Sequence, residues 1–284
     1  MEWIKMKNCD MHVHTIYSDG TLRPSEIIDI AISNKIYAIA ITDHDTTEGV
    51  INALNLIPDK KLNIIPGIEL SAILEGFDIH ILGYWIDYKN VDLIKKLNDI
   101  KAVRIERIEK MVKNLYDIAS IKIDIEEVMK EGNYYTLGRP HIARVLIRHG
   151  YANDISDAFD KYLNKDSPIY VEKYRLSPEE AVKMIVDAGG APVLAHPGLI
   201  DNKSLIPEII KAGIYGIEVY HPKHKTDDIY LAHVFAEKYN LIETGGSDFH
   251  SPEDDTIGKC TIPYYNMIKL KERIKHRGFT SSIL

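Results

Sequence analysis

The sequence predicts an α/β fold on a largely parallel sheet, with a helical insertion in its middle. From residue 10 to residue 89, short apolar runs alternate with helical patterns, as they do in βα units. The alternation stops near residue 90, where a long amphipathic pattern begins, and it resumes after residue 185. We therefore expect one discontinuous sheet domain, 1–89 with 186–284, and one insertion, 90–185.

The expected strands are short and apolar, and polar residues follow several of them directly. Before the insertion they span residues 10–13, 37–41, 63–65, 67–70 and 77–86. After the insertion they span residues 191–195, 216–220 and 241–245. A helix is expected at 25–34, directly after Pro24, because proline is favoured at the start of a helix.

The insertion is expected to be helical. Residues 91–119 form a long amphipathic pattern, in which apolar side chains recur at helical spacing from Ile105 to Ile118. Further helices are expected at 125–131, 140–149 and 155–163. Ser177 with Glu180 is a capping-box pattern, which starts another helix.

The composition indicates a globular protein and excludes several kinds of partner. The chain has 284 residues, 45% of them hydrophobic, which is enough for a sizeable core. A formal net charge of −7 argues against a broad basic surface for duplex nucleic acid. Cys9 and Cys260 lack the spacing of a thiolate zinc site. Because no apolar run has bilayer length and no signal-peptide core is present, we expect a cytoplasmic protein without a membrane partner.

Histidines and carboxylates concentrate within or just past the ends of the expected strands. In α/β sheets, the carboxyl ends of parallel strands form the active-site face, so residues distant in sequence converge there. The residues at these positions are His12, His14, His44, Glu69, His196, His221, Asp248 and His250. Because imidazole and carboxylate ligands suit zinc, manganese or iron, the pattern predicts a pocket for two or three divalent cations.

Two of these motifs place a pair of ligands on one face of the chain. Positions i and i+2 of a strand share a face, so His12 and His14 can reach one cation, and Asp248 and His250 repeat the arrangement. Taken alone, the His-x-His pair also fits two ordinary polar residues on a half-exposed strand. Glu69 lies inside the apolar run IPGIEL, where a carboxylate needs either a metal or an ion pair.

Two further histidines have ordinary alternatives. His80, inside the run FDIHILGYW, also fits a core histidine without a metal. His196 precedes Pro197 at a strand end, and it also fits a turn residue. Both become candidate ligands only in the company of the other residues.

The motifs together resemble those of the PHP (polymerase and histidinol phosphatase) superfamily. The matching segments, in the family's order from residue 10 to residue 250, are DMHVHTIYSDG, ITDHDT, GIELS, AHPG and GSDFH. The resemblance implies a metal-dependent phosphoesterase with a distorted (β/α)7 TIM-like barrel and metals at the strand ends. The barrel would comprise 1–89 and 186–284, and the helical insertion 90–185 would cap the substrate.

The resemblance also implies nine metal ligands. The first metal would be held by His12, His14, Glu69 and Asp248. Glu69 would bridge to a second metal, held also by His80 and His196. A third metal would be held by Asp19, His44 and His250. Manganese, iron and zinc are the expected cations; some family members have histidine at the position of Asp19.

Three shorter segments resemble a branch of the superfamily that hydrolyses small nucleotides: GRPHIARVLI, PIYVEKY and EVYHPKH. That branch includes 3′,5′-bisphosphate nucleotidases and exoribonucleases that act on short RNA. We therefore expect a small phosphorylated substrate, either a nucleotide or a short single-stranded RNA. The residues expected to bind it are Arg139, His141, Arg144, Lys173, His221 and His224. His221 is also the candidate that protonates the leaving alcohol.

Other interpretations stay open at this point. Arg144 and Arg148 also fit a solvated basic helix face. A histidinol-phosphate or other small-metabolite phosphatase would use the same barrel with another substrate. A non-catalytic PHP module would keep the fold, although the intact ligand set argues against it, and a structural metal protein would leave no open coordination position.

Overall fold

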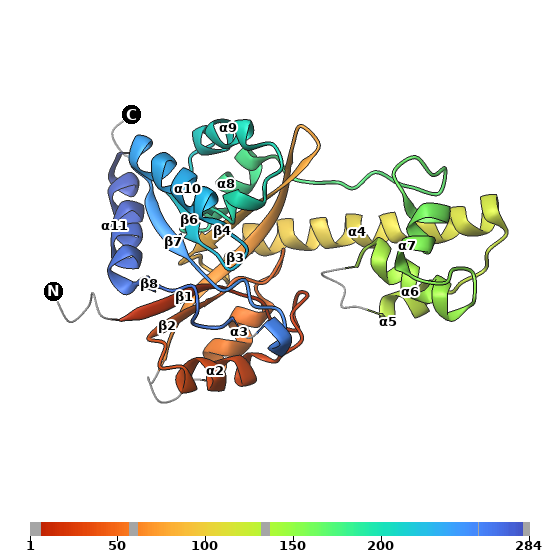
Figure 1. Cartoon of the computed structure of the whole chain (residues 1–284), viewed down its shortest axis with the longest axis horizontal. Coiled ribbons are helices and arrows are strands. Elements are labelled where there is room, and N and C mark those ends of the chain that lie inside the picture. The colour runs from red at the N-terminus through yellow and green to blue at the C-terminus, as the bar shows by residue number, and fades with distance from the viewer. Residues whose placement is uncertain (1–6, 57–61, 132–136, 255, 281–284) are drawn as a thin grey trace. The chain divides into compact units, whose positions relative to one another are not determined.

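The computed structural model describes residues 7–56, 62–131, 137–254 and 256–280 (Figure 1). The chain divides into two compact units. The sheet unit comprises 1–94 and 175–284, and the helical unit comprises 95–174. Among the described residues, no helix is long and apolar enough to cross a membrane.

The sheet unit is built on one mixed sheet, for which eight strands are found among the described residues, in the order β7-β6-β5-β4-β3-β2-β1-β8. Their bounds are β1 Asn8–Val13, β2 Ala38–Ile41, β3 Asn63–Leu74, β4 Phe77–Tyr84, β5 Ala191–Leu194, β6 Gly216–Tyr220, β7 Ile242–Gly245 and β8 Ile262–Pro263. The sheet curls back on itself, because Val13 bridges in parallel to Phe249, just past β7. The His14 amide also donates to the Phe249 carbonyl at 2.9 Å. The expected α/β fold with a barrel-like sheet is therefore confirmed.

The expectation of a largely parallel sheet is wrong at β8, which pairs antiparallel with β1, and at β4. Strand β4 runs antiparallel to both neighbours, β3 and β5, whereas the β1–β2, β2–β3, β5–β6 and β6–β7 pairs are parallel. The reversal follows from a tight turn at Glu75 and Gly76, whose φ angles are 49° and 86°. Two successive residues with positive φ suit the twist of a two-residue hairpin. β3 and β4 therefore form a hairpin rather than two steps of βα alternation.

The two short strands expected at 63–65 and 67–70 are one continuous strand. β3 pairs with β2 as far as Pro66 and with β4 from Gly67 onward. Proline cannot donate a ladder hydrogen bond, and at Pro66 the pairing changes from one neighbour to the other. The strand thus extends past the end of β2, and this extension carries Glu69.

Helices pack around the sheet. Their bounds are α2 Pro24–Ser33, α3 Glu48–Asn55, α8 Pro178–Asp187, α9 Ile206–Lys211, α10 Thr226–Lys238 and α11 Tyr264–Thr280. The predicted capping box is present at α8, where Ser177 accepts from the Glu180 amide and Glu180 accepts from the Ser177 amide. Apolar side chains of β1, β2, β4 and β5 form one core cluster with Met267 and Leu270 of α11. Burial of these side chains fixes the strands whose ends carry the polar residues.

The helical unit has its own core. It contains most of α4 Val91–Ala119, with α5 Ile125–Lys130, α6 Arg139–Arg148 and α7 Ile155–Ala158, which continues as one π-helical turn at Phe159–Leu163. Met111 and Leu115 of α4 are buried with Val145 and Leu146 of α6. The face of α6 that carries Val145 and Leu146 is therefore part of this core. The predicted insertion, 90–185, has wider bounds than this unit, 95–174. At its carboxyl-terminal end, α8 packs on β3, β4 and β5 of the sheet unit.

Candidate metal centre

Histidines and carboxylates converge at one rim of the curled sheet. His12 lies on β1, and His14, His44, His196 and Asp248 follow β1, β2, β5 and β7 directly or within a few residues. His80 reaches the same rim for another reason. β4 runs antiparallel, so its amino-terminal half lies level with the extended part of β3, and His80 pairs with Ser71, two residues past Glu69.

Four of the predicted ligands form the centre of this cluster. The Nε2 atoms of His12 and His14 are 3.1 Å apart, and each lies 3.2 Å from Oε2 of Glu69. Oδ1 of Asp248 is 3.3 Å from the first of these nitrogens and 3.2 Å from the second. His12, His14 and Glu69 are buried and Asp248 is nearly so. Such a group of ligand atoms is large enough to surround one cation.

The other oxygen of Glu69 faces a second group. Oε1 lies 3.0 Å from Nδ1 of His80 and 3.1 Å from Nε2 of His196. Nδ1 of His44 lies 3.2 Å from Oε2 of the same carboxylate. His44, Glu69 and His80 can together hold a cation. Glu69 thus stands between two sets of histidines, with His12, His14 and His44 at Oε2 and His80 and His196 at Oε1.

A third group gathers around Asp19. Its Oδ1 lies 3.3 Å from Nε2 of His250 and 3.5 Å from Nδ1 of His14, and its Oδ2 lies 3.7 Å from Nε2 of His44. These four residues form another potential cation site. All nine predicted ligands therefore lie in one connected cluster.

Two buried nitrogens test whether a metal fits this cluster. Nδ1 of His44 and Nδ1 of His80 are buried without a hydrogen-bond partner in the described part of the chain. Both lie close to Glu69, so their lone pairs and its oxygens point toward common positions rather than along shared hydrogen bonds. An unpaired buried polar atom is costly, and coordination of a cation removes that cost. The donor set suits divalent cations of the zinc, iron and manganese group.

Burial and opposite charge compete in the cluster. Burial raises the pKa of Glu69, but the imidazoles of His44, His12 and His80 hold that pKa well below its usual value. Burial lowers the pKa of His14, but hydrogen bonds to Asp248 and Glu69 raise it to about 10. Protonated histidines therefore neutralise the carboxylates when no cation does so.

Three carboxylates that the sequence analysis missed hold the cluster in place. Glu218, fully buried on β6, accepts from Nδ1 of His12 at 3.1 Å and from the His196 amide at 2.8 Å. Asp43 accepts from Ser18 at 2.7 Å, and the Ser18 hydroxyl lies 3.3 Å from Nδ1 of His14. Asp10 accepts from the Ser247 and Gly258 amides, both at 2.8 Å. A carboxylate bonded to the second nitrogen of a ligand histidine fixes its tautomer and its orientation.

A signal for Glu218 was present in the sequence. It interrupts the apolar run GIEVY in the same way that Glu69 interrupts IPGIEL. The cost of burying a carboxylate points to a partner in both cases. Only the fold distinguishes the residue that faces the cluster from the one that supports it.

The backbone is strained at two of the candidate ligands. His196 has a φ of 24° and Asp248 a φ of 48°, in a region that side chains with a Cβ rarely adopt. The glycine before Ser247 allows the necessary approach, because a Cβ at Gly246 would lie 2.3 Å from the Cβ of His12. A residue with a Cβ would therefore clash with His12 at this position.

His221 and His224 are held by neighbouring groups. Nδ1 of His221 accepts from the Lys223 amide at 3.1 Å, so Nε2 carries the proton and donates to Oδ2 of Asp248, also at 3.1 Å. His224 donates from Nδ1 to the Val219 carbonyl at 2.8 Å and accepts at Nε2 from the Gly198 amide at 3.1 Å. His221 thus orients Asp248, and both nitrogens of His224 serve the main chain. The assignments of both histidines to substrate stay untested predictions that these bonds do not favour.

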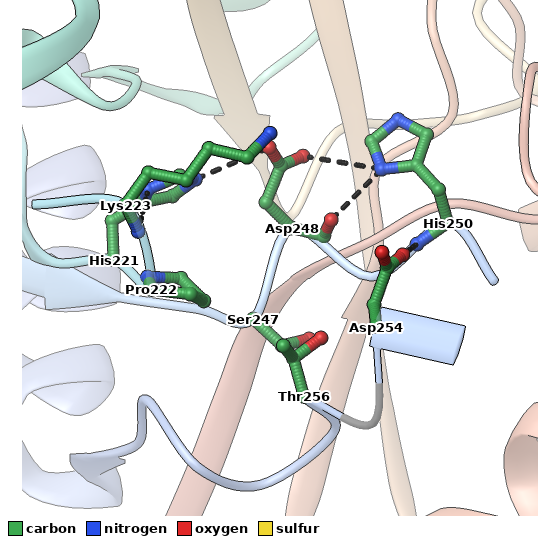
Figure 2. A pocket seen from close by; sticks show the side chains of 8 residues that line it. All are labelled: His221, Pro222, Lys223, Ser247, Asp248, His250, Asp254 and Thr256. Carbon is green, nitrogen blue, oxygen red and sulfur yellow. Dashed lines mark hydrogen bonds and ion pairs between the residues drawn. The ribbon is translucent and has the colours of Figure 1, made fainter. Parts of the chain in front are cut away.

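A pocket opens beside the cluster, with a volume of about 310 Å³ (Figure 2). It is lined by His221, Pro222, Lys223, Ser247, Asp248, His250, Asp254 and Thr256. Asp248 and His250 of the cluster border it, and His250 is held by a hydrogen bond from its amide to Asp254 at 3.1 Å. Asp248 and His250 therefore border open space large enough for a small molecule.

The remaining predicted substrate residues, Arg139, His141, Arg144 and Lys173, belong to the helical unit. Nη1 of Arg139 donates to the Leu163 carbonyl at 2.9 Å, and its guanidinium lies 5.1 Å from the ring centre of Phe159. Nδ1 of His141 lies 3.1 Å from the amide nitrogen and 3.3 Å from the carbonyl oxygen of Gly138, so this ring nitrogen is engaged by the main chain. Arg148 instead pairs with Glu127 and Glu131, as expected of a solvated helix face.

A barrel-like α/β sheet with clustered histidines and carboxylates at one rim defines a metal-dependent hydrolase. The family model described as "PHP domain" matches residues 10–186. Over 253 residues the chain is 36% identical to the 3′,5′-nucleoside bisphosphate phosphatase of Chromobacterium violaceum, covering 87% of this chain and 88% of that protein. It is 31% identical to the Escherichia coli 5′-3′ exoribonuclease Rnm over 250 residues, covering 86% and 85% of the two chains.

Solved structures agree with the sequence relatives. A Bifidobacterium adolescentis protein assigned as a metal-dependent phosphoesterase is 28% identical and superposes with a TM-score of 0.76, covering 93% of this chain and 96% of its own. The chain belongs to the PHP domain family of metal-dependent phosphoesterases. The resemblance on which the sequence analysis relied is therefore confirmed.

Proposed function

We propose that this phosphoesterase hydrolyses a phosphate ester of a small nucleotide, with a nucleoside 3′,5′-bisphosphate or a short oligoribonucleotide as its substrate. The observation that carries the proposal is the set of three overlapping ligand groups around Glu69, His14 and His44 at one rim. The two relatives named above, a nucleoside bisphosphate phosphatase and an exoribonuclease, support the nucleotide as the substrate class.

Two or three divalent cations, of manganese, iron or zinc, would be held by the nine clustered residues. In this proposal one is held by His12, His14, Glu69 and Asp248, a second by Glu69, His80 and His196, and a third by Asp19, His44 and His250. Cations held there would supply a nucleophilic water of lowered pKa and would neutralise charge on the phosphoryl oxygens. No covalent enzyme intermediate is needed.

The chain's own residues prepare the site for that chemistry. Glu69 keeps its two oxygens directed to two groups of histidines, and its low pKa keeps it ionised. Glu218 holds His12 in the tautomer whose Nε2 faces the cluster. His221 donates to Asp248 and so leaves Oδ1 of that carboxylate directed at His12 and His14. These bonds hold the donor atoms in place before a substrate binds.

A substrate with a second phosphate needs another anion contact. We assign it to the helical unit, with Arg139 and His141 at the amino-terminal end of α6 and with Arg144 and Lys173 as further candidates. Arg139 supports this assignment because its planar guanidinium is already oriented by the Leu163 carbonyl and the ring of Phe159. Helix amino termini also favour anions.

The test is a comparison of substrates with manganese-loaded protein. We expect the highest kcat/KM on a nucleoside 3′,5′-bisphosphate or a short oligoribonucleotide and a lower value on histidinol phosphate. Asp248→Asn serves as the inactive control, because it removes one anionic ligand oxygen at the centre of the cluster. Preference for histidinol phosphate would overturn the nucleotide assignment, and absence of hydrolysis by metal-saturated protein would favour the structural or non-catalytic alternative.

A further inference from the structure

The pocket beside the cluster is lined by a lysine, Lys223, to which no role has been assigned so far. Lys223 lies in its wall, together with Asp248 and His250 (Figure 2). In the described part of the chain, the Lys223 ammonium makes no ion pair within 4.0 Å. Its side chain is exposed, so it can reorient toward a ligand. A cation in this position is available to an anion that enters the pocket.

The main chain around Lys223 is fixed although its side chain is not. The Lys223 amide donates to His221, and the next residue, His224, is bonded at both ring nitrogens to the main chain. The main chain from which the Lys223 side chain extends is therefore held in place. Substitution of the side chain leaves the amide bond to His221 intact, so the effect of the charge can be measured by itself.

The rest of the pocket also suits an anion that accepts hydrogen bonds. The hydroxyl of Thr256, another lining residue, is buried without a hydrogen-bond partner in the described residues. The carboxylate of Asp254 is engaged by its own loop, accepting from the amides of His250 and Ser251 at 3.1 and 2.9 Å. The volume of about 310 Å³ exceeds that of a water molecule many times, which leaves room for a phosphoryl group and part of its alcohol.

We infer that Lys223 is a substrate-binding residue that donates a hydrogen bond to the phosphoryl group undergoing hydrolysis. The inference rests on the proposed function, and it gives Lys223 a role different from that of Arg139. A phosphoryl group that enters the pocket beside Asp248 and His250 would contact the metal ions that these two residues are proposed to hold. Lys223 lines the same pocket, so it would face the phosphate that reacts. A lysine ammonium is a compact charge that suits a phosphate oxygen.

The experiment compares manganese-loaded wild-type protein with Lys223→Met, Lys223→Arg and Lys225→Met. Lys225 offers a matched control, because it is an exposed lysine of the same connection that does not line the pocket. Binding of inorganic phosphate is measured by calorimetry, and kcat/KM is measured on phenyl phosphate. Metal content is determined for every variant.

We expect Lys223→Met to weaken phosphate binding roughly 10- to 100-fold, as for one lost charge-assisted hydrogen bond. Lys223→Arg should recover most of that loss, and Lys225→Met should bind like the wild type. Equal phosphate affinity of Lys223→Met and Lys225→Met would overturn the assignment while leaving the proposed function intact. Loss of metal from Lys223→Met would overturn it too, because the side chain would then support the cluster. Wild-type protein that holds metal but binds no phosphate would overturn both the inference and the proposed function.

Discussion

At the scale of single residues, the cluster depends on groups that orient its ligands. Glu218 connects two of the ligand groups, because one carboxylate accepts from the ring of His12 and from the main chain of His196. His196 is held with a φ of 24°, a conformation that needs support from its surroundings. A substitution of Glu218 should therefore weaken metal binding, although Glu218 is not itself a predicted metal ligand.

Glu218→Gln is expected to lower the affinity for divalent metal about 10- to 100-fold, the usual effect of losing a partner of a ligand histidine. Glutamine is uncharged and replaces one of the two acceptor oxygens with an amide donor, so the charge-assisted bonding to His12 and to the His196 amide is weakened. The measurement is a metal titration by competition with a chelator. Glu243→Gln on neighbouring β7 is the control, since Glu243 pairs with His233 outside the cluster. If the two variants bind metal equally well, Glu218 has no positioning role.

Metal binding should release protons. In metal-free protein the pKa of His14 is raised to about 10, and that of His12 is raised well above its usual value by Glu218, Glu69 and Asp248 against the effect of burial. His14 is therefore protonated at pH 7.5 and must lose that proton to bind a cation, and the raised pKa of His12 acts in the same direction. His44, whose pKa burial lowers to about 4, is already neutral and releases none.

The affinity of the protein for metal should depend on pH through the protons that the cation displaces. Because protons compete with the cation, affinity for metal should rise as the pH rises from 7 to 9, by about tenfold per pH unit for each released proton. Calorimetry of manganese binding in buffers of different ionisation enthalpy counts these protons. A heat of binding independent of the buffer would show that neither histidine is protonated.

At the scale of elements, one reversed strand positions two residues of the cluster, and the proposed second phosphate contact depends on one helix. The β3–β4 hairpin extends the sheet past the end of β2 and carries Glu69 and His80 on adjacent strands. Helix α6 buries Val145 and Leu146 and leaves Arg144 exposed, so its polar side stays available to a ligand. The guanidinium of Arg148, on the same helix, is instead paired with Glu127 and Glu131.

Arg139→Ala should lower kcat/KM on a nucleoside 3′,5′-bisphosphate. The lost transition-state stabilisation should be about 2–3 kcal/mol, as for a lost charge-assisted hydrogen bond. The value on a simple monophosphate ester should be unaffected. Arg148→Ala on the same helix is the control, since exposed ion pairs contribute little. The two substrates are assayed side by side for each variant. Equal loss on both substrates, or no loss on either, would remove Arg139 from this role.

At the scale of the whole molecule, the cluster places several charges in the interior of the sheet unit. Glu69, Glu218 and His12 are buried, and each is compensated by its neighbours. A cation bound only by the folded state stabilises that state by mass action, by about 4 kcal/mol at a thousand times its dissociation constant. Metal should therefore stabilise the fold as well as enable the reaction.

Chelation should abolish hydrolysis and lower the melting temperature by about 10 °C, and added manganese should restore both. Circular dichroism follows the melting, and elemental analysis verifies the metal content. A sample free of manganese, iron and zinc that hydrolyses its substrate at the full rate would contradict the mechanism. Unchanged melting with lost activity would limit the role of the metal to chemistry.

Local patterns in the sequence predicted much of this protein. Apolar runs located β1, β2, β5, β6 and β7, and the polar residues at or beyond their ends predicted the rim at which the ligands meet. This succeeds because the direction of parallel strands places their carboxyl ends together, whatever their separation in sequence. The i and i+2 spacing of His12 and His14 was sufficient to predict that both rings share a face.

What only the tertiary structure decided are the relations between distant segments. An apolar run does not show its direction in the sheet, so the antiparallel course of β4 was missed, and with it the reason that His80 reaches the rim. His12 and Glu218 are separated by 206 residues, and nothing local to either shows that they pair. The bonds of His221 and His224 were likewise invisible, since they depend on main-chain groups whose orientation the loop conformation sets. Residue types and spacing determine which chemistry is available, whereas long-range packing determines which residues bind the metal and which hold those ligands in place.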